Sequence, residues 1–234
     1  MAIDFARVRA ITFDCYGTLI DWETGLLRAL RPALAVHGVQ ADDDAILELF
    51  AALEQEQESG PYKTYREVLW EVMLGIGRHF DRAFAERQIE GLAESIARWP
   101  AFADTPTALR VFGERFPLNI ISNIDDDLFE LTRPKLGATF DRIVTAEYCR
   151  SYKPAVRNFN VMLALLDLAP EQVLHVAQSL YHDIGPARTL GMQTVWVNRR
   201  AGRRGSGATP AATAIPDLET PDLASLVQVI ERAG

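Results

Sequence analysis

The 234-residue chain has few cysteines, no excess of positive charge and no long hydrophobic run. Its two cysteines, Cys15 and Cys149, lack the spacing of a metal site or a redox pair, so we expect a reducing, cytoplasmic location. A net charge of −8 at pH 7 disfavours a nucleic-acid partner. No apolar run reaches the ~18 residues of a membrane span, and residues 1–7 do not form a signal peptide. We therefore expect no membrane partner, and the oligomeric state stays open, a homodimer included.

Apolar residues make up 48% of the chain, which is enough for a sizeable core. In the first part of the chain they recur at helical spacing, and no strand pattern interrupts them from residue 22 to residue 99. Four apolar stripes lie in this segment, near residues 26–34, 46–53, 65–76 and 80–96. The segment therefore predicts a four-helix insertion, which the connections at 21–25 and 99–103 would join to the rest.

Outside this segment, short apolar runs alternate with helical patterns. Strands are expected at residues 10–13, 118–123, 142–146, 173–177 and 194–197. A helix should begin at Thr105, with Thr105 as its N-cap and Pro106 in its first turn. The alternation predicts an α/β fold with a doubly wound, Rossmann-like parallel sheet. Residues 1–21 and 100–234 would form this core, and residues 22–99 a helical cap.

The first predicted strand delivers a carboxylate, Asp14, at its carboxyl end. Gly17 then allows a tight turn, and the hydroxyl of Thr18 can hydrogen-bond a group held there. A buried carboxylate is costly unless it has a role, and attack on a substrate to form an ester is one such role. The alternative, an aspartate that only caps a turn, is common. Cys15 fits a small buried side chain.

Three further polar stations follow the next strands. They are Ser122-Asn123, Lys153-Pro154, and the segment from Ser179 to Asp183. Ligands of parallel sheets bind at the carboxyl ends of the strands, where these stations would meet Asp14. Lys153 could instead be a surface lysine, and Asp183 could cap the helix that follows it.

Together, Asp14-Cys-Tyr-Gly-Thr18 and the three later stations resemble the haloacid dehalogenase superfamily over nearly the whole chain. Its phosphatases usually carry a second aspartate where this chain has Tyr16, and its metal-dependent members an aspartate where this chain has Gln178. An amide is a poor replacement for a carboxylate ligand of Mg²⁺. The motif looks instead like the metal-free (S)-2-haloacid dehalogenases, so the resemblance implies neither a metal nor another cofactor.

The resemblance also implies roles for individual residues. Asp14 would be the nucleophile, Thr18 and Lys153 would hold it, and Asp183 would orient or activate water. Substrate would be bound by Cys15, Tyr16, Ser122, Asn123 and Ser179, with Ser122 at its carboxylate and Asn123 at the departing halide.

Several positions fit the dehalogenase pattern less well or keep an open role. Phe159 and Leu180 replace a hydroxyl-bearing aromatic residue and an asparagine of these dehalogenases. Lys63 and Arg66 are the candidates for a cap residue that binds halide. His182 could be a base or a loop histidine, while His175 shows no partner spacing. The arginine-rich segment 199–214 could bind an anion, but a solvated loop is favoured.

These observations predict a metal-independent hydrolase that converts a small 2-haloalkanoic acid to a 2-hydroxy acid through an aspartyl ester. Its partner would be a small carboxylic acid. The alternatives are the same chemistry on a C–F bond or a strained ring, a Mg²⁺-dependent phosphatase, and a binding protein without catalysis.

Overall fold

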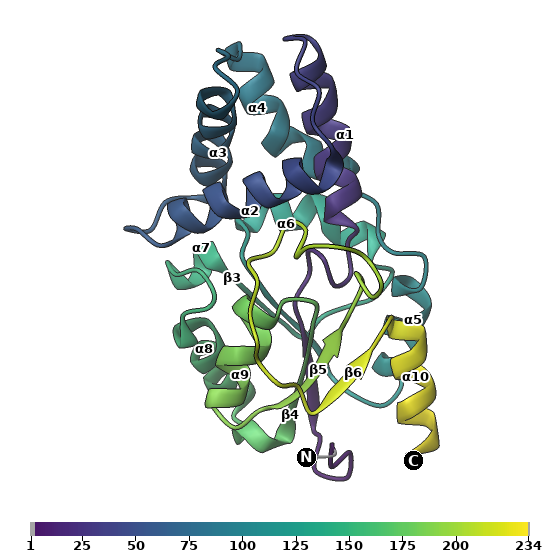
Figure 1. Ribbon diagram of the computed structural model, residues 1–234. Helices are drawn as coiled ribbons and strands as arrows, with labels where there is room; N and C mark the ends of the chain where they lie inside the picture. Colours follow the sequence, from purple (N-terminus) through teal and green to yellow (C-terminus); the bar gives the residue numbers. More distant parts are fainter. Residues whose placement is uncertain (1–2, 234) are drawn as a thin grey trace.

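The computed structural model describes residues 3–233 as a six-stranded sheet flanked by helices, with four more helices beyond one end (Figure 1). All neighbouring strands run parallel, in the order β3-β2-β1-β4-β5-β6. The strands are β1 (Ala10–Phe13), β2 (Leu118–Ser122), β3 (Arg142–Thr145), β4 (Val173–Ala177), β5 (Gln193–Val197) and β6 (Leu218–Thr220). The predicted doubly wound α/β fold is confirmed.

The order of the strands fixes where a ligand can bind. From β1 the chain adds β2 and β3 on one side and then β4, β5 and β6 on the other. Phe13 at the end of β1 pairs with Ile120 of β2 and with Val176 of β4. The strand order thus reverses between β1 and β4, and a crevice is expected outside the carboxyl ends of these two strands.

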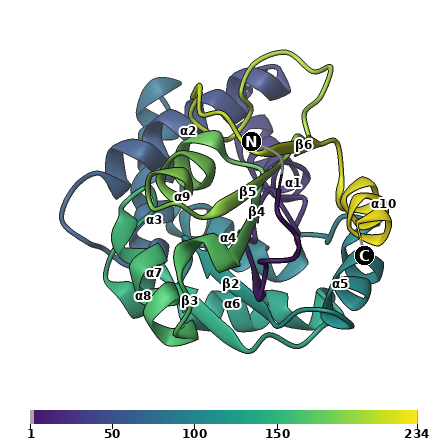
Figure 2. The ribbon, with the colours of Figure 1, turned by 90° about the horizontal axis from the view of Figure 1, so that it is seen from below.

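Helices cover both faces of the sheet (Figure 2). On one face lie α5 (Thr105–Gly113) and α10 (Leu223–Arg232), where Phe13 stacks on Phe112 with ring centroids 5.8 Å apart. On the other lie α8 (Val156–Leu166) and α9 (Gly185–Thr189), with Phe159 and Met162 in a second hydrophobic cluster. Because both faces are buried, the strands appear in the sequence as nearly continuous apolar runs.

Four helices extend over the carboxyl ends of the strands (Figure 1). They are α1 (Trp22–Ala35), α2 (Asp43–Glu58), α3 (Tyr65–His79) and α4 (Glu86–Ser95), followed by a 3₁₀ turn (Ile96–Arg98). The two connections to the sheet lie side by side, because Asp21 N donates to Pro100 O at 2.8 Å and Ile20 bridges Ala101. We call α1–α4 the cap; its separation as a domain at residues 22 and 99 stays a prediction.

The remaining elements are short. They are α6 (Asp126–Thr132) with a 3₁₀ turn (Arg133–Lys135), α7 (Ala146–Cys149), a 3₁₀ turn (Pro170–Gln172) and a π-helical turn (Leu180–Ile184). None of the helices in the described part of the chain is both long and apolar enough to cross a bilayer.

Several local predictions need correction. Strand β6 was not predicted, since its three residues offer no apolar run. Asp104, not Thr105, occupies the N-cap position of α5 and makes no side-chain cap hydrogen bond there, while the hydroxyl of Thr105 donates to Leu19 O at 2.8 Å. Phe80 and Phe84 precede α4 and pack against the main core instead of forming its first turn. Each error arises because tertiary contacts decide the ends of short elements.

Candidate active site

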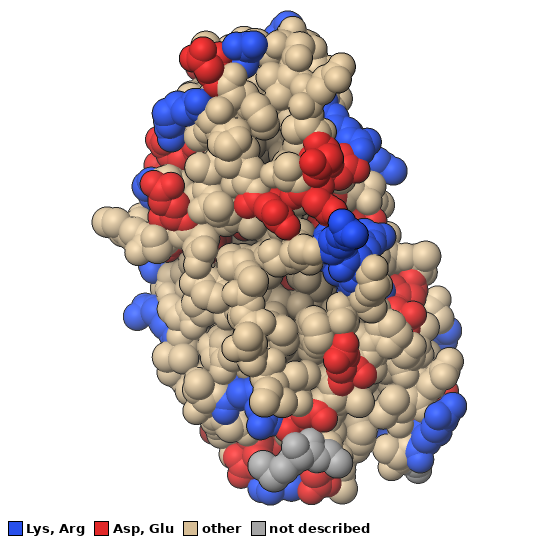
Figure 3. All heavy atoms as spheres, in the orientation of Figure 1, with Lys and Arg blue, Asp and Glu red and all other residues tan. Residues whose placement is uncertain are grey.

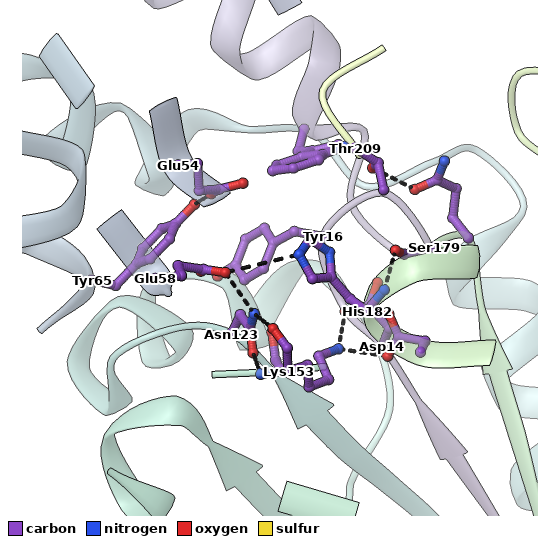
Figure 4. Close-up of a pocket in the computed structure, with 14 residues that line it drawn as sticks. Asp14, Tyr16, Glu54, Glu58, Tyr65, Asn123, Lys153, Ser179, His182 and Thr209 are labelled. Carbon is purple, nitrogen blue, oxygen red and sulfur yellow. Dashed lines mark hydrogen bonds and ion pairs between the residues drawn. The ribbon is translucent and has the colours of Figure 1, made fainter. Parts of the chain in front are cut away.

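The carboxyl ends of β1, β2 and β4 meet at a pocket beneath the cap, and Figure 4 shows the side chains that line it. From the core come Asp14, Tyr16, Ser122, Asn123, Lys153, Gln178, Ser179, His182, Asp183 and Thr209, and from the cap come Trp22, Glu54, Glu58 and Tyr65. The space enclosed between them is ≈ 40 Å³, or about three water molecules. The pocket thus suits a small ligand.

Asp14 is held by two donors. Its Oδ1 accepts from Lys153 Nζ at 2.8 Å, and its Oδ2 accepts from the hydroxyl of Thr18 at 2.7 Å. The hydroxyl oxygen of Thr18 accepts from Gln178 N at 2.9 Å, which ties the β1 turn to the end of β4. Thr18 and Lys153 therefore fix the Asp14 carboxylate in the way the sequence predicts.

Lys153 is buried between two carboxylates rather than exposed on the surface. Besides Asp14, its Nζ donates to Asp183 Oδ1 at 2.7 Å and to Ile121 O at 2.9 Å. Burial by itself would lower the pKa of Lys153, but Asp14 and Asp183 more than offset this effect and raise it. An ammonium group has three donors, so the fold uses all of them.

Asp183 lies within the π-helical turn and does not cap a helix; Ser179 does, accepting from His182 N at 2.8 Å. His175 Nε2 lies 3.0 Å from Asp183 Oδ1, and its Nδ1 lies 2.9 Å from the hydroxyl of Thr12. The expectation that His175 lacks a partner was wrong, and its place in the strand just before Asp183 was the available signal.

The three buried charges shift one another's pKa. Burial raises the pKa of Asp14, Lys153 lowers it in part, and Asp183 adds to the rise. Burial opposes ionisation of Asp183 too, but Lys153 and His175 outweigh burial and hold its pKa below the usual range. The charge of Asp183 is thus the better stabilised of the two carboxylates, and Asp14 is the more basic one.

The predicted substrate-binding residues are placed unequally. Ser122 lines the pocket with a buried hydroxyl that has no hydrogen-bond partner among the described residues. Asn123 is already engaged, since its Oδ1 accepts from Lys153 N and its Nδ2 donates to Lys153 O and to Glu58. Ser179 lines the pocket while it caps the π-helical turn.

The hydroxyl of Tyr16 and the side chain of Cys15 do not contact the Asp14 carboxylate. The hydroxyl of Tyr16 bonds that of Thr132 at 2.9 Å, although its ring borders the pocket. The side chain of Cys15 lies in the hydrophobic core, where burial raises the pKa of its thiol well above the usual value. The structure does not bring the Cys15 side chain to the pocket, so its predicted part in binding gains no support.

The two cap candidates for an anion, Lys63 and Arg66, lie elsewhere. Lys63 Nζ donates to Gln57 Oε1, and Arg66 forms an exposed ion pair with Asp127. The cap instead contributes Glu54 and Glu58, which the sequence analysis did not single out. Their spacing could have indicated that they are buried, because Glu54 and Glu58 continue the face of α2 that carries Leu47 and Phe50.

Of the positions that differ from the dehalogenase pattern, Phe159 and Leu180 do not line the pocket, whereas Gln178 does. Phe159 is fully buried beside His175, with ring centroids 5.2 Å apart, and Leu180 is not among the residues that line the pocket. The side chain of Gln178 accepts from Thr209 at 3.1 Å, so its amide oxygen faces the loop after β5.

That loop joins the core to the cap, which neither sequence alternative anticipated. Arg200 forms ion pairs with Glu23 of α1 and with Asp44 of α2, and Arg199 pairs with Asp104. Figure 3 shows basic and acidic side chains adjoining at the level of α2. Both arginine side chains are 9% exposed, so they are not free to bind a solution anion.

The side chains available in the pocket do not fit Mg²⁺, the cation used by metal-dependent members of the superfamily that the sequence resembles. Both oxygens of Asp14 already accept from Lys153 and Thr18, and Gln178 supplies an amide engaged by Thr209. Within residues 3–233, no three carboxylate, imidazole or thiolate side chains are arranged to hold a metal ion. We derive no step through a metal.

A family model described as haloacid dehalogenase-like hydrolase matches residues 8–191, and the chain belongs to this family of hydrolases. It is 24% identical to an (S)-2-haloacid dehalogenase of Pseudomonas sp. (strain YL), over 97% of this chain and 96% of the relative. It is 26% identical to the Escherichia coli phosphatase YigB, which acts on 5-amino-6-(5-phospho-D-ribitylamino)uracil, over 96% and 97%. The L-2-haloacid dehalogenase of Xanthobacter autotrophicus shares the fold, with a TM-score of 0.78, 19% identity and coverage of 96% and 98%.

Proposed function

We propose that this hydrolase cleaves a bond between carbon and a leaving group through an ester on Asp14, without a metal ion. The observation that carries the proposal is the fixed Asp14 carboxylate, held on one oxygen by Lys153 and on the other by Thr18. Such a carboxylate is oriented for attack, while its contact with the buried ammonium group offsets part of the cost of burying its charge.

In the first step, an oxygen of Asp14 attacks the substrate carbon, and the bonding electron pair leaves with the halide. Halide needs no proton to depart, so the absence of an acid at Tyr16 is no obstacle. In the second step, water attacks the carbonyl carbon of the Asp14 ester and frees the hydroxy product. Asp183 is suited to orient this water, since its Oδ2 is buried in the pocket without a partner among the described residues.

His182 is the other group that can receive a proton from water. Burial lowers its pKa to about 4, so the imidazole is neutral at pH 7 and able to accept. It lines the pocket with its Nε2 3.9 Å from Glu58 Oε2. We assign the orienting role to Asp183 because Lys153 and His175 hold it in place.

The names of the relatives make small 2-halo acids the first compounds to test. Phosphatases occur among the relatives at similar identity, but phosphoryl transfer depends on cations that neutralise the phosphate. Lys153 has no donor left for that purpose, and the donor set does not fit Mg²⁺. A cytoplasmic location accompanies the proposal and is supported by two free, buried cysteines.

A single turnover in H₂¹⁸O with enzyme in excess tests the mechanism. The solvent oxygen should enter Asp14, because water attacks the aspartyl carbonyl, and the product hydroxyl should be unlabelled. Asp14→Asn should lower turnover by about 10⁴-fold or more, since an amide is a poor nucleophile. Asp141→Asn, an exposed aspartate just before β3 at the opposite, amino end of the sheet, is the control and should retain activity.

Two outcomes contradict the proposal. Label in the product hydroxyl, with Asp14 unlabelled, means that water attacks the substrate directly. Turnover that is lost in chelator and restored by Mg²⁺, or hydrolysis of an aryl phosphate with added Mg²⁺, favours the phosphatase.

A further inference from the structure

The cap wall of the pocket is acidic. Glu54 and Glu58 lie one turn apart on α2, and their carboxyl groups face the space above Asp14 and Lys153 (Figure 4). Glu54 is 4% exposed and the Glu58 side chain 6% exposed. Glu54 Oε1 accepts from the hydroxyl of Tyr65 at 2.6 Å, and Glu58 Oε2 accepts from Asn123 Nδ2 at 3.2 Å.

Within residues 3–233, no permanently charged basic side chain forms an ion pair with either glutamate. Of the described residues that line the pocket, Lys153 alone carries a basic side chain with a permanent charge, and its three donors are used by Asp14, Asp183 and Ile121 O. His182, 3.9 Å from Glu58, has its pKa lowered to about 4 by burial and is neutral at pH 7. The pocket therefore combines four carboxyl groups with one lysine.

Two further polar groups in the pocket lack a partner. The hydroxyl of Ser122 and Oδ2 of Asp183 are buried, line the same space and make no hydrogen bond within the described residues. Both can accept a hydrogen bond from a ligand. Since buried polar groups are normally paired, these two indicate that polar atoms of a ligand or of water complete the site.

The protonation of the cap wall follows from its burial. Burial raises the pKa of Glu54 to about 8, against the hydrogen bond from Tyr65. Burial and the neighbouring Glu54 raise the pKa of Glu58 well above its usual value, although Lys153 and Asn123 lower it in part. A positive charge placed between the two carboxyl groups would favour their ionised forms and displace these protons.

We propose that the substrate carries a positively charged nitrogen that binds between Glu54 and Glu58 while its reacting carbon faces Asp14. The inference rests on the proposed function and names the substrate class of the same site: a small amine or amidine with a leaving group on carbon, such as an amino-substituted 2-halo acid. The enclosed space of ≈ 40 Å³ admits only a small molecule of this kind unless the cap opens.

Binding of two small ions tests the inference without turnover. Propylammonium and propionate have the same chain length and opposite charge, and calorimetry on the full chain gives their dissociation constants at neutral pH. Wild type should bind propylammonium at least about tenfold more tightly than propionate. The binding heat should also depend on the buffer, because the cation releases protons from the cap wall.

Variants locate the preference. Glu54→Gln with Glu58→Gln should weaken propylammonium binding by about tenfold or more and remove the proton release. Glu56→Gln, an exposed residue on the same helix, is the matched control and should bind as wild type does. Circular dichroism confirms that the variants are folded, and the comparison of the two ions on wild type stands without any variant.

Three results overturn the inference: tighter binding of propionate than of propylammonium, binding of neither ion, or a cation preference that survives the double substitution. Tighter propionate binding that weakens with rising pH would mean that the protonated glutamates donate to an anion. Because these measurements need no chemistry, a negative result leaves the ¹⁸O test of Asp14 standing, and the converse also holds.

Discussion

The pocket has a floor, formed by Asp14, Lys153 and Asp183, and a cap wall, formed by Glu54 and Glu58. The two regions differ in whether the fold itself supplies a counter-charge for the buried carboxyl groups. On the floor, Lys153 contacts both Asp14 and Asp183, so positive and negative charges balance within the fold. On the wall, Glu54 and Glu58 have hydrogen bonds from Tyr65 and Asn123 but, among the described residues, no ion pair within 3.5 Å. The contacts of the floor are thus complete within the fold, and our proposal is that a cationic ligand completes those of the wall.

The largest expected effect comes from removing the charge that balances the floor. Lys153→Met leaves two buried carboxylates without their cation, which should cost about 3–5 kcal/mol of unfolding free energy. The loss should grow with pH, because Asp14 and Asp183 must then take up protons to stay buried. Urea unfolding at several pH values measures both effects.

Lys63→Met is the matched control, because the hydrogen bond that its ammonium group makes within the described residues is to the neutral side chain of Gln57. It should change stability by no more than about 0.5 kcal/mol. If the two substitutions cost the same, the cluster of Lys153, Asp14 and Asp183 contributes nothing specific to the fold.

At the cap wall, removing a titratable group should have the opposite effect: the stability of Glu54→Gln relative to wild type should rise with pH. The folded protein raises the pKa of Glu54 from 4.5 to about 8, so it binds this proton more tightly than the unfolded chain does. Wild type therefore loses stability as pH rises from 4.5 to about 8, with a slope of up to about 1.4 kcal/mol per pH unit for one proton. Glu54→Gln cannot ionise, so its stability relative to wild type should increase over this range and level off above it.

The measurement is urea unfolding of both proteins from acid to mildly alkaline pH. Glu56→Gln is again the control, since an exposed glutamate on α2 should leave the pH profile unchanged. If the difference in unfolding free energy between Glu54→Gln and wild type is the same at every pH, the pKa of Glu54 is not raised by its burial.

The smallest effect is expected at the edge between floor and wall. Tyr16→Phe removes the hydrogen bond between the Tyr16 and Thr132 hydroxyls, which should cost about 1 kcal/mol in urea unfolding. Turnover should fall by less than about tenfold, because this hydroxyl is held away from Asp14. A much larger fall in kcat at unchanged stability would instead make Tyr16 the proton donor to the leaving group.

Much of the fold and of the floor was predictable from the sequence. Buried parallel strands appear in the sequence as continuous apolar runs. Asp14 follows the first run, Ser122 ends the second, and Lys153 lies in the segment after the third. The wall was not predictable in the same way, because Glu54 and Glu58 lie in a helix far from these motifs in the chain. Helical spacing places them on the apolar face of α2 but does not say what that face covers.

The sequence is sufficient to predict the α/β class, the order of the strands along the chain and the polar positions Asp14 and Lys153 at the strand ends. It could do so because local periodicity and the rule that ligands bind at strand ends act over short stretches. The tertiary structure is needed to show that His175 contacts Asp183, that Arg200 joins the loop after β5 to the cap, and that two glutamates face the space above Asp14. Those contacts join segments that are distant in the chain, and their energies depend on burial, which no local pattern specifies.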